Sequence, residues 1–304
     1  MRNTISRLLI SFFLAQSVNA NYLEVTLLGT GTPRPSIDRF GAATLVKVGG
    51  QNLLFDVGRG ATIRLKQAGL TPNMIDKVFL THLHSDHISG LDDLWITGWV
   101  WQRHDMLTVS GPTGTHQLVK GLRQAYASDI AYREENVNLD SDLAKIKSHE
   151  INEGVVYQQD GVTVRAFLVD HAPVKPAFGY RIEFGDRAVV ISGDTTYSDN
   201  LIKHAQEADL LVHEITAAMP SLLQRNKRLA KIVAYHTTPD QLIQVLNKIM
   251  PRYTVLNHVL LFGVPEDNVI EKITSQYAGE VVMGYDLMNI GVGDSIRIEQ
   301  INVK

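Results

Sequence analysis

Thr81-His82-Leu83-His84-Ser85-Asp86-His87 places three imidazoles and a carboxylate within six residues of the chain. The run Lys77-Val78-Phe79-Leu80 before it predicts a buried strand, and Ile88-Ser89-Gly90-Leu91 after it leads into a helix. We therefore expect a strand-to-helix loop whose side chains converge on one point. Neutral imidazole is a common ligand of zinc, copper, iron and nickel, and a carboxylate suits harder cations. The spacing H-x-H-x-D-H arises by chance in roughly one such chain in a thousand, so it predicts a metal site.

Composition limits what this chain can be. Its 304 residues, 44% of them hydrophobic, are sufficient for a sizeable core. The net charge is −3 and no dense run of Lys and Arg occurs, so the overall positive charge expected of a nucleic-acid binder is absent. A local basic patch is still compatible with this net charge. The sequence contains no cysteine, which excludes disulfides and thiolate ligands. Any metal must therefore be bound by nitrogen and oxygen.

The first twenty residues have the pattern of a secretory signal peptide. Arg2 and Arg7 give a positive start, residues 8–15 form an apolar core too short to span a bilayer, and Ala20 is a small residue for cleavage. We predict a signal peptide over 1–20, a mature chain over 21–304, and a periplasmic or secreted protein. A first core helix or an uncleaved anchor is the alternative. No later segment is long and apolar enough for a transmembrane helix, so no membrane association is expected.

Short β-like runs alternate with helical stretches after residue 20, which predicts one layered α/β domain. Residues 43–57 predict a hairpin across Gly49-Gly50, and 155–191 is strand-rich with turns at Asp160-Gly161 and Gly185-Asp186. The polar, poorly periodic stretch 128–148 predicts an irregular connection. A helix is expected over 91–103, and its tryptophans either line a substrate pocket or pack against the sheet; they are Trp95, Trp99 and Trp101.

Three more candidate ligands follow β-like runs further along the chain. His171 comes after Phe167-Leu168-Val169-Asp170, Asp194 after a run ending in Ser192-Gly193, and His258 after Val255-Leu256-Asn257. Strand ends in layered α/β folds gather polar side chains at one edge. Each residue alone is weak evidence, but their order and context together predict a single site with the 82–87 cluster.

At this point the chain resembles the metallo-β-lactamase superfamily, whose members carry H-x-H-x-D-H, then a His, an Asp or Cys, and a His. The resemblance covers nearly the whole mature chain and implies a four-layer αβ/βα sandwich, with two β-sheets face to face and helices outside. It also implies two metal sites. The family pattern assigns one metal to His82, His84 and His171, the second to Asp86, His87 and His258, and the bridge between them to Asp194.

The implied cofactors are two divalent metal ions, with Zn²⁺ as the first choice and Mn²⁺ or Fe²⁺ as alternatives. Two cations about 4 Å apart share a water molecule and lower its pKa toward neutrality. Asp86 can also orient that water. Because Asp194 offers oxygen where lactam-cleaving members often carry Cys, the pattern favours phosphate or sulfate esters over β-lactams.

Two further segments resemble the ribonuclease Z-like branch of the superfamily. Asp209-Leu210-Leu211-Val212-His213-Glu214-Ile215-Thr216 is similar to its His-Glu segment, and Tyr235-His236-Thr237-Thr238 to its His-Ser-Thr segment. The resemblance implies that His236 donates a proton to the leaving group while Glu214 holds its tautomer. The alternative for His236 is a surface residue at a helix entry. His213 is expected to be structural or to support the site, and surface positions are expected for His104, His116, His149 and His204.

Substrate class is the least determined prediction. The branch contains tRNA 3′-processing enzymes, other phosphodiesterases and exported arylsulfatases. No Gly/Pro-rich tRNA-gripping arm separates His171 from Asp194, and an apolar Val259-Leu260-Leu261-Phe262 follows the last ligand. With the signal peptide, these features predict an exported arylsulfatase-like hydrolase of small-molecule aryl sulfate esters, without a nucleic-acid substrate. The alternatives are a ribonuclease Z-like phosphodiesterase and an inactive metal-binding member. Members of this family often dimerise, so a homodimer is compatible with the sequence.

Overall fold

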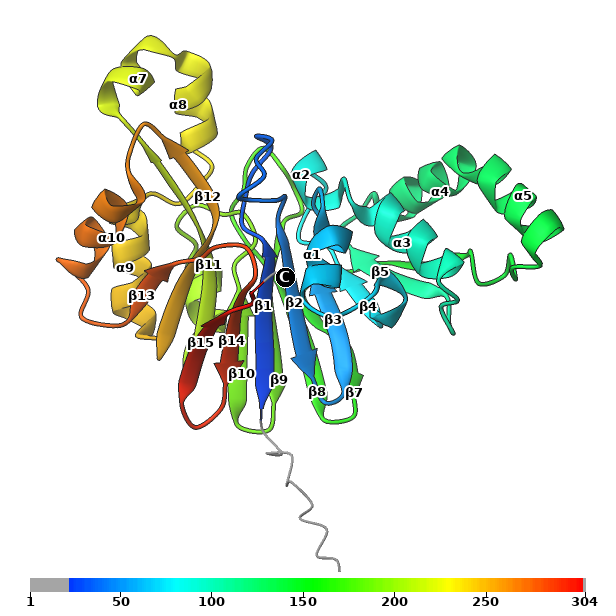
Figure 1. Ribbon diagram of the computed structural model, residues 1–304. Coiled ribbons are helices and arrows are strands. Elements are labelled where there is room, and N and C mark those ends of the chain that lie inside the picture. Colours follow the sequence, from blue (N-terminus) through cyan, green and yellow to red (C-terminus); the bar gives the residue numbers. More distant parts are fainter. Residues whose placement is uncertain (1–21, 303–304) are drawn as a thin grey trace, which may run out of the picture.

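The computed structural model describes residues 22–302, so the predicted signal peptide lies outside the described residues. Two β-sheets lie face to face with helices on their outer surfaces, which confirms the predicted αβ/βα sandwich (Figure 1). Within residues 22–302, no helix has both the length and the apolar character needed to cross a membrane.

The first sheet has eight strands in the order β15-β14-β1-β2-β3-β4-β5-β6. Its strands β3, β4, β5 and β6 are parallel, so their carboxyl ends lie at one edge. The strands are β1 Leu23–Gly29, β2 Ala43–Val48, β3 Gln51–Phe55, β4 Lys77–Phe79, β5 Leu107–Gly111, β6 Ile146–Glu150, β14 Met288–Val292 and β15 Ile296–Gln300.

The second sheet has seven strands in the order β13-β12-β11-β10-β9-β8-β7, of which β10 to β13 are parallel. The predicted hairpins across residues 49–50, 160–161 and 185–186 are confirmed as β2–β3, β7–β8 and β9–β10. The strands are β7 Gly154–Gln159, β8 Val162–Leu168, β9 Phe178–Phe184, β10 Arg187–Ile191, β11 Leu210–Ala218, β12 Tyr253–Phe262 and β13 Val281–Met283.

Three apolar layers hold the sandwich together. Side chains such as Val25, Phe79, Tyr180 and Val212 fill the space between the two sheets. Helices α1 and α3 pack on the outside of the first sheet, and α6, α9 and α10 on the outside of the second. The helical elements are α1 Ala61–Gln67, η1 Pro72–Met74, α2 Ser85–Ile88, α3 Leu91–Val100, α4 Thr115–Ala125, α5 Ala127–Val137, α6 Asp199–His204, α7 Pro220–Arg225, α8 Lys227–Val233, α9 Pro239–Ile249 and α10 Glu266–Thr274.

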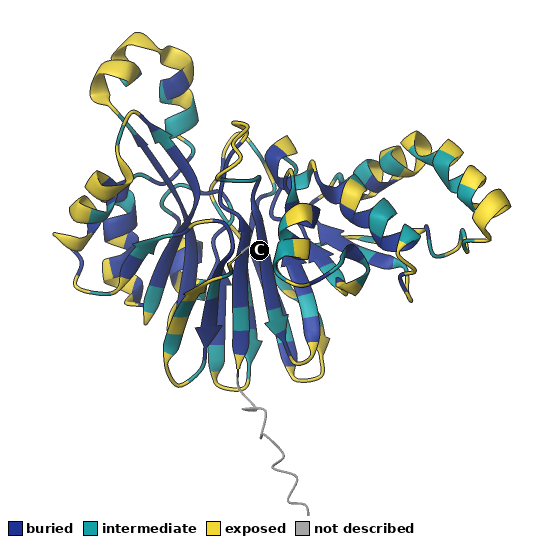
Figure 2. Cartoon of the chain, in the orientation of Figure 1, coloured by how far each residue is buried: buried dark blue, intermediate teal, exposed yellow. Residues whose placement is uncertain are grey.

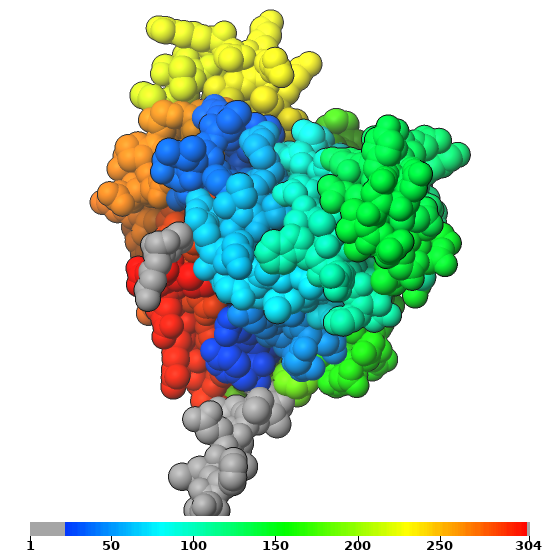
Figure 3. Space-filling model, turned by 45° about the vertical axis from the view of Figure 1, so that its right-hand side comes forward, coloured from blue at the N-terminus to red at the C-terminus, as the bar shows by residue number. Residues whose placement is uncertain are grey.

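The prediction of an irregular connection over 128–148 is wrong, because this stretch contains most of α5 and the edge strand β6. Helix α5 has no buried residue, so it lacks the apolar periodicity by which a helix is found in a sequence (Figure 2). Helices α4 and α5 project from one side of the molecule, and α7 and α8 stand above its top edge (Figure 3).

The tryptophans of α3 serve packing rather than substrate binding. Trp95 and Trp99 are buried, and their indole N–H groups donate to the carbonyls of Ala144 and Asp140 at 2.9 and 2.8 Å. Trp101 follows the helix and is half exposed. The packing alternative for Trp95 and Trp99 is therefore confirmed.

Candidate metal centre

The loop after β4 carries the histidine cluster, as the sequence predicts. His82 and His84 lie in the loop, while Asp86 and His87 belong to the single turn of α2. Thr81 begins this loop and donates from its backbone N–H and its hydroxyl to the two oxygens of Asp56, both at 2.8 Å. The loop is thereby fixed to the end of β3, the neighbouring parallel strand.

Asp56 is a supporting residue that the sequence analysis missed. It directly follows β3 with a left-handed backbone (φ 59°), and its Oδ2 lies 2.7 Å from His87 Nδ1. This contact fixes the ring so that His87 Nε2 is directed into the site, a common role for a carboxylate behind a ligating histidine. The sequence did contain an indication of this role, because Asp56 directly follows an apolar run, as Asp194 does.

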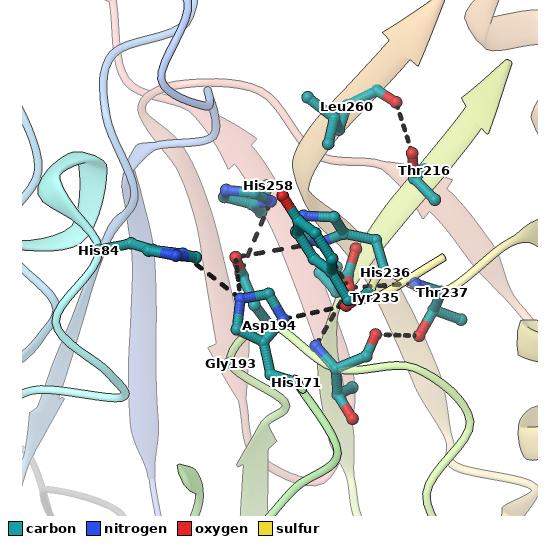
Figure 4. A network of polar contacts seen from close by, with 12 residues as sticks. His84, His171, Gly193, Asp194, Thr216, Tyr235, His236, Thr237, His258 and Leu260 are labelled. Carbon is teal, nitrogen blue, oxygen red and sulfur yellow. Dashed lines mark hydrogen bonds and ion pairs between the residues drawn. The ribbon is translucent and has the colours of Figure 1, made fainter. Parts of the chain in front are cut away.

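The three distant candidates meet the loop around Asp194 (Figure 4). Asp194 Oδ2 lies 3.7 Å from His82 Nε2, 3.4 Å from His87 Nε2 and 3.8 Å from His171 Nε2, and Asp194 Oδ1 lies 3.5 Å from His258 Nδ1. Two further pairs of ligand candidates also lie close together. They are His82 Nε2 to His84 Nδ1 at 3.0 Å and His258 Nε2 to Asp86 Oδ2 at 3.1 Å.

This donor set fits two cations. His82, His84, His171 and Asp194 form one group of ligand atoms within 4.8 Å of one another, and Asp86, His87 and His258 form a second. His87 Nε2, Asp194 Oδ1 and His258 Nδ1 are buried without a hydrogen-bond partner, and such atoms are costly unless something else satisfies them. The imidazole and carboxylate cluster thus suggests divalent metals, bound by nitrogen and oxygen alone.

Electrostatics keeps part of this donor set ready for cations. Burial disfavours the charged His87 ring, but Asp194 and Asp56 outweigh it and raise the pKa of His87 well above its usual value. Burial lowers the pKa of His82 well below its usual value, and burial also lowers the pKa of His171, so both rings are neutral ligands. Burial alone would raise the pKa of Asp194, but the neighbouring His258 and His87 outweigh it and hold that pKa well below its usual value. Asp194 is therefore ionised at neutral pH.

A β-bulge places His258 in the centre. The pairing of β11 with β12 shifts register between Glu214 and Ile215, where β12 has one extra residue. That residue is His258, whose backbone is left-handed with a φ of 42°. The next residue, Val259, donates its backbone N–H to the Thr30 carbonyl at 2.9 Å. Bulges re-aim side chains beside functional sites, which explains how a residue in the middle of a strand becomes a ligand candidate.

The predicted pair His236 and Glu214 is also brought together beside this centre. His236 is buried, which excludes the alternative of a surface histidine, and its Nδ1 lies 3.0 Å from Glu214 Oε1 and 4.0 Å from Asp194 Oδ2. Glu214 Oε1 also accepts from the backbone N–H groups of Thr195 and Thr237, both at 3.1 Å. Burial disfavours the charged ring, but Glu214 outweighs it and raises the pKa of His236 to about 9.

The remaining histidines lie outside this arrangement. His213 is buried, with Nδ1 2.7 Å from the Glu214 carbonyl. His104, His116 and His149 are exposed, as predicted. His204 is partly buried, and its ring stacks on Phe167 with ring centroids 4.9 Å apart.

Curated relatives match this chain over nearly their whole length. Ribonuclease Z of Mycobacterium sp. (strain KMS) is 36% identical over 286 residues, which cover 91% of this chain and 99% of the relative. Ribonuclease Z of Mycobacterium bovis (strain BCG / Pasteur 1173P2) is 36% identical over 278 residues, or 89% and 98%. This chain belongs to the ribonuclease Z-like branch of the metallo-β-lactamase superfamily. Within it, residues 23–250 match the family model described as Anti-Pycsar protein Apyc1.

Solved structures of the superfamily share the fold. The short form of human tRNase Z superposes with a TM-score of 0.63 at 26% identity, covering 88% of this chain and 98% of that one. The metallo-β-lactamase fold protein YhfI from Bacillus subtilis gives a TM-score of 0.70 at 20% identity, with 90% and 100% covered. At that lower identity the likeness to YhfI shows the fold alone.

The prediction of a small-molecule ester as the partner, with nucleic acid disfavoured, is wrong for this member of the branch. Its relatives are named ribonuclease Z and tRNase Z, and those names specify RNA substrates. That prediction rested on the missing arm, the apolar Val259-Leu260-Leu261-Phe262 and the signal-peptide pattern, and none of these shows where cations lie on the surface. The same relatives support the phosphodiesterase alternative over aryl sulfate hydrolysis.

A cleft of about 650 Å³ opens above the centre of this ribonuclease Z-like protein. It is lined by ligand candidates, by Pro33 and Arg34 of the loop between β1 and β2, and by residues of α7, α8 and Tyr235. Side chains of β12 complete the apolar part. The lining residues other than the ligand candidates are Pro33, Arg34, Ser85, Leu222, Asn226, Arg228, Leu229, Ile232, Tyr235, Leu260 and Phe262.

Proposed function

We propose that this protein is a metal-dependent phosphodiesterase of the ribonuclease Z type, which hydrolyses phosphodiester bonds in RNA. The observation that carries the proposal is the convergence of seven imidazole and carboxylate side chains at the base of an open cleft, with the His236–Glu214 pair beside them. The near full-length likeness to ribonuclease Z supplies the substrate class.

In this proposal the ligands divide into two sets around Asp194. His82, His84 and His171 hold one cation, Asp86, His87 and His258 hold the other, and Zn²⁺ is the first choice, with Mn²⁺ or Fe²⁺ as alternatives. When bound, such a pair polarises the scissile phosphoryl group and makes a water molecule more acidic. Asp86, whose Oδ2 faces His258, is placed to orient the attacking water.

His236 donates the proton that the departing oxygen needs. Glu214 accepts from Nδ1, which leaves Nε2–H of the charged ring for the substrate. A sugar alkoxide is a poor leaving group, so proton donation is essential for RNA. The charge of bound cations would also bring the raised pKa of His236 down toward the working pH, where a general acid is most effective.

The test compares three substrates on purified, metal-loaded protein: an RNA oligonucleotide, bis-p-nitrophenyl phosphate and p-nitrophenyl sulfate. We expect turnover of both phosphodiesters, its loss on chelation and its return with metal. Turnover of the sulfate without the phosphodiesters would contradict the proposal. Full metal occupancy with no ester turned over would instead support an inactive metal-binding member.

A further inference from the structure

The α7–α8 hairpin, residues 219–235, stands above the sandwich at the metal end (Figures 1 and 3). It leaves β11 at Met219, whose N–H bonds to the Phe262 carbonyl at 3.0 Å, and it returns directly into His236. Its apolar contacts form a small cluster of their own around Leu229, Leu260 and Phe262. The hairpin is thus joined both to the proposed acid and to the strand that bears His258.

Four cations and no acid occur between Pro220 and Thr238, although the chain as a whole carries −3. All four are exposed and, among residues 22–302, none of them forms an ion pair with a carboxylate. Some other exposed cations, such as Arg133 and Lys272, pair with nearby acids, whereas within residues 22–302 Lys120 and Lys203 form no ion pair. Clustered like charges repel one another, so this arrangement favours a polyanionic partner. The four cations are Arg225, Lys227, Arg228 and Lys231.

Two arginines from different segments line the cleft. Arg228 lines it from α8, and Arg34 lines it from the loop between β1 and β2. The Arg34 guanidinium is held in place, because it lies 4.2 Å from the centroid of the Phe262 ring and donates to the Leu261 carbonyl at 3.2 Å. A chain lying in the cleft therefore meets two positive groups besides the ligand candidates.

The apolar lining of the cleft is suited to bases. Leu222, Leu229 and Ile232 of the hairpin, with Tyr235 and Phe262, present apolar and aromatic surface to the cleft. Proteins that bind single-stranded nucleic acid combine a cationic track for the backbone with such surfaces for the bases. A substrate with a single phosphate would not occupy a row of four cations, whereas a strand of several nucleotides would.

We propose that the α7–α8 hairpin is an RNA clamp, which holds a single-stranded segment along Arg225, Lys227, Arg228 and Lys231 and passes its scissile phosphate past Arg34 and Arg228. This inference rests on the proposed function, because the strand is placed for cleavage at the metal centre. The clamp sets which phosphodiesters are used, and the metal centre cleaves them.

The test neutralises the three hairpin cations that do not line the cleft, as R225Q/K227Q/K231Q. A matched control, K120Q/R123Q/K203Q, removes the same charge from exposed positions on α4 and α6. The readouts are kcat and KM for a short single-stranded RNA at several salt concentrations, kinetics on bis-p-nitrophenyl phosphate, and anisotropy of fluorescein-labelled RNA. The charge-preserving variant R225K/K227R/K231R reports whether the hairpin tolerates substitution.

We expect the hairpin variant to raise KM for RNA on the order of tenfold and to flatten the slope of log KM against log salt by about 2, since three phosphate contacts are lost. The control and the charge-preserving variant should keep the wild-type slope, and a duplex of the same sequence should compete more weakly than the single strand. An equal loss in the hairpin variant and the control, or equal competition by the duplex, would overturn the clamp.

Failure of the proposed function has a different signature. Metal-loaded wild-type protein would then leave bis-p-nitrophenyl phosphate intact. The anisotropy measurement would still test the clamp, because it needs only RNA binding. The clamp is supported if the hairpin variant flattens the dependence of RNA affinity on salt and the control variant does not. It is overturned if the hairpin variant leaves that dependence unchanged.

Discussion

The metal-ligand loop and the α7–α8 hairpin both line one cleft but are built in opposite ways. The loop over residues 81–87 is largely buried and is bonded to Asp56, so its side chains are held rigidly. The hairpin is exposed, has its own small apolar cluster and carries like charges. A change in the loop should therefore affect every substrate, whereas a change in the hairpin should affect only substrates that reach it.

The largest effect should come from His84→Ala. His84 is the half-buried member of the first ligand group, and its removal deletes a ligand nitrogen. We expect turnover of all esters to fall by more than the ~100-fold that loss of a supporting residue typically causes, with a drop in bound metal. Metal analysis and kinetics check this, with the exposed His104→Ala as control. Unchanged turnover at full metal occupancy would refute the ligand assignment.

His236→Ala should discriminate between substrates without emptying the metal site. Loss of a general acid typically slows a reaction by about 10² to 10⁴-fold, and only a poor leaving group needs the proton. We therefore expect RNA cleavage to slow far more than hydrolysis of bis-p-nitrophenyl phosphate. Single-turnover rates on both substrates test this. Equal slowing would remove His236 from the acid role.

Asp56→Asn should weaken the centre without deleting a ligand. An amide in place of the Asp56 carboxylate is a weaker acceptor for His87 Nδ1–H and for Thr81. Supporting residues of this kind typically contribute about 10 to 100-fold in metal affinity. Competition with a chelator measures the change. Asp209→Asn is the matched control, since that buried carboxylate bonds to Ala188 and Arg252 at the other end of β11, and it should leave metal affinity as it is.

The sequence predicted the loop better than the hairpin, and the reason is physical. The ligand candidates follow apolar strands. Parallel strands bring their carboxyl ends to one edge, which places Asp194 after β10, and β8 runs in the same direction as β10 because the antiparallel β9 lies between them, which places His171 at that edge too. The bulge at His258 depends on how β11 and β12 pair, which no local pattern reveals.

The hairpin was missed because its signal is a local excess of charge within an acidic chain. The four cations of residues 225–231 are not visible in a net charge of −3, because acids elsewhere in the chain offset them. Helices α7 and α8 are also only six and seven residues long, which is too short to show a periodic apolar face. Helix α5 escaped prediction for the related reason that it buries nothing. Exposed elements that act through charge are therefore where sequence patterns are least informative.

The smallest effect should come from Asn226→Ala, and it sharpens the contrast between the two regions. Asn226 Oδ1 caps α8 by accepting from the Leu229 N–H at 3.0 Å, and loss of such a cap typically costs about 1 kcal/mol. Because the hairpin packs through a separate small cluster, we expect this loss to appear as local opening. Amide exchange over 227–233 should then speed up on the order of fivefold, while exchange over 81–87 stays at its wild-type rate.

Ser198→Ala removes the cap of α6, where the Ser198 hydroxyl accepts from Leu201 N–H at 3.4 Å and Leu201 packs into the core of the second sheet. That variant should lower the free energy of unfolding of the whole sandwich, because α6 cannot open without exposing the core. If Asn226→Ala instead behaves like Ser198→Ala, the hairpin unfolds together with the metal-ligand loop. The two regions would then form one cooperative unit, and substrate selection could not vary independently of the metal site.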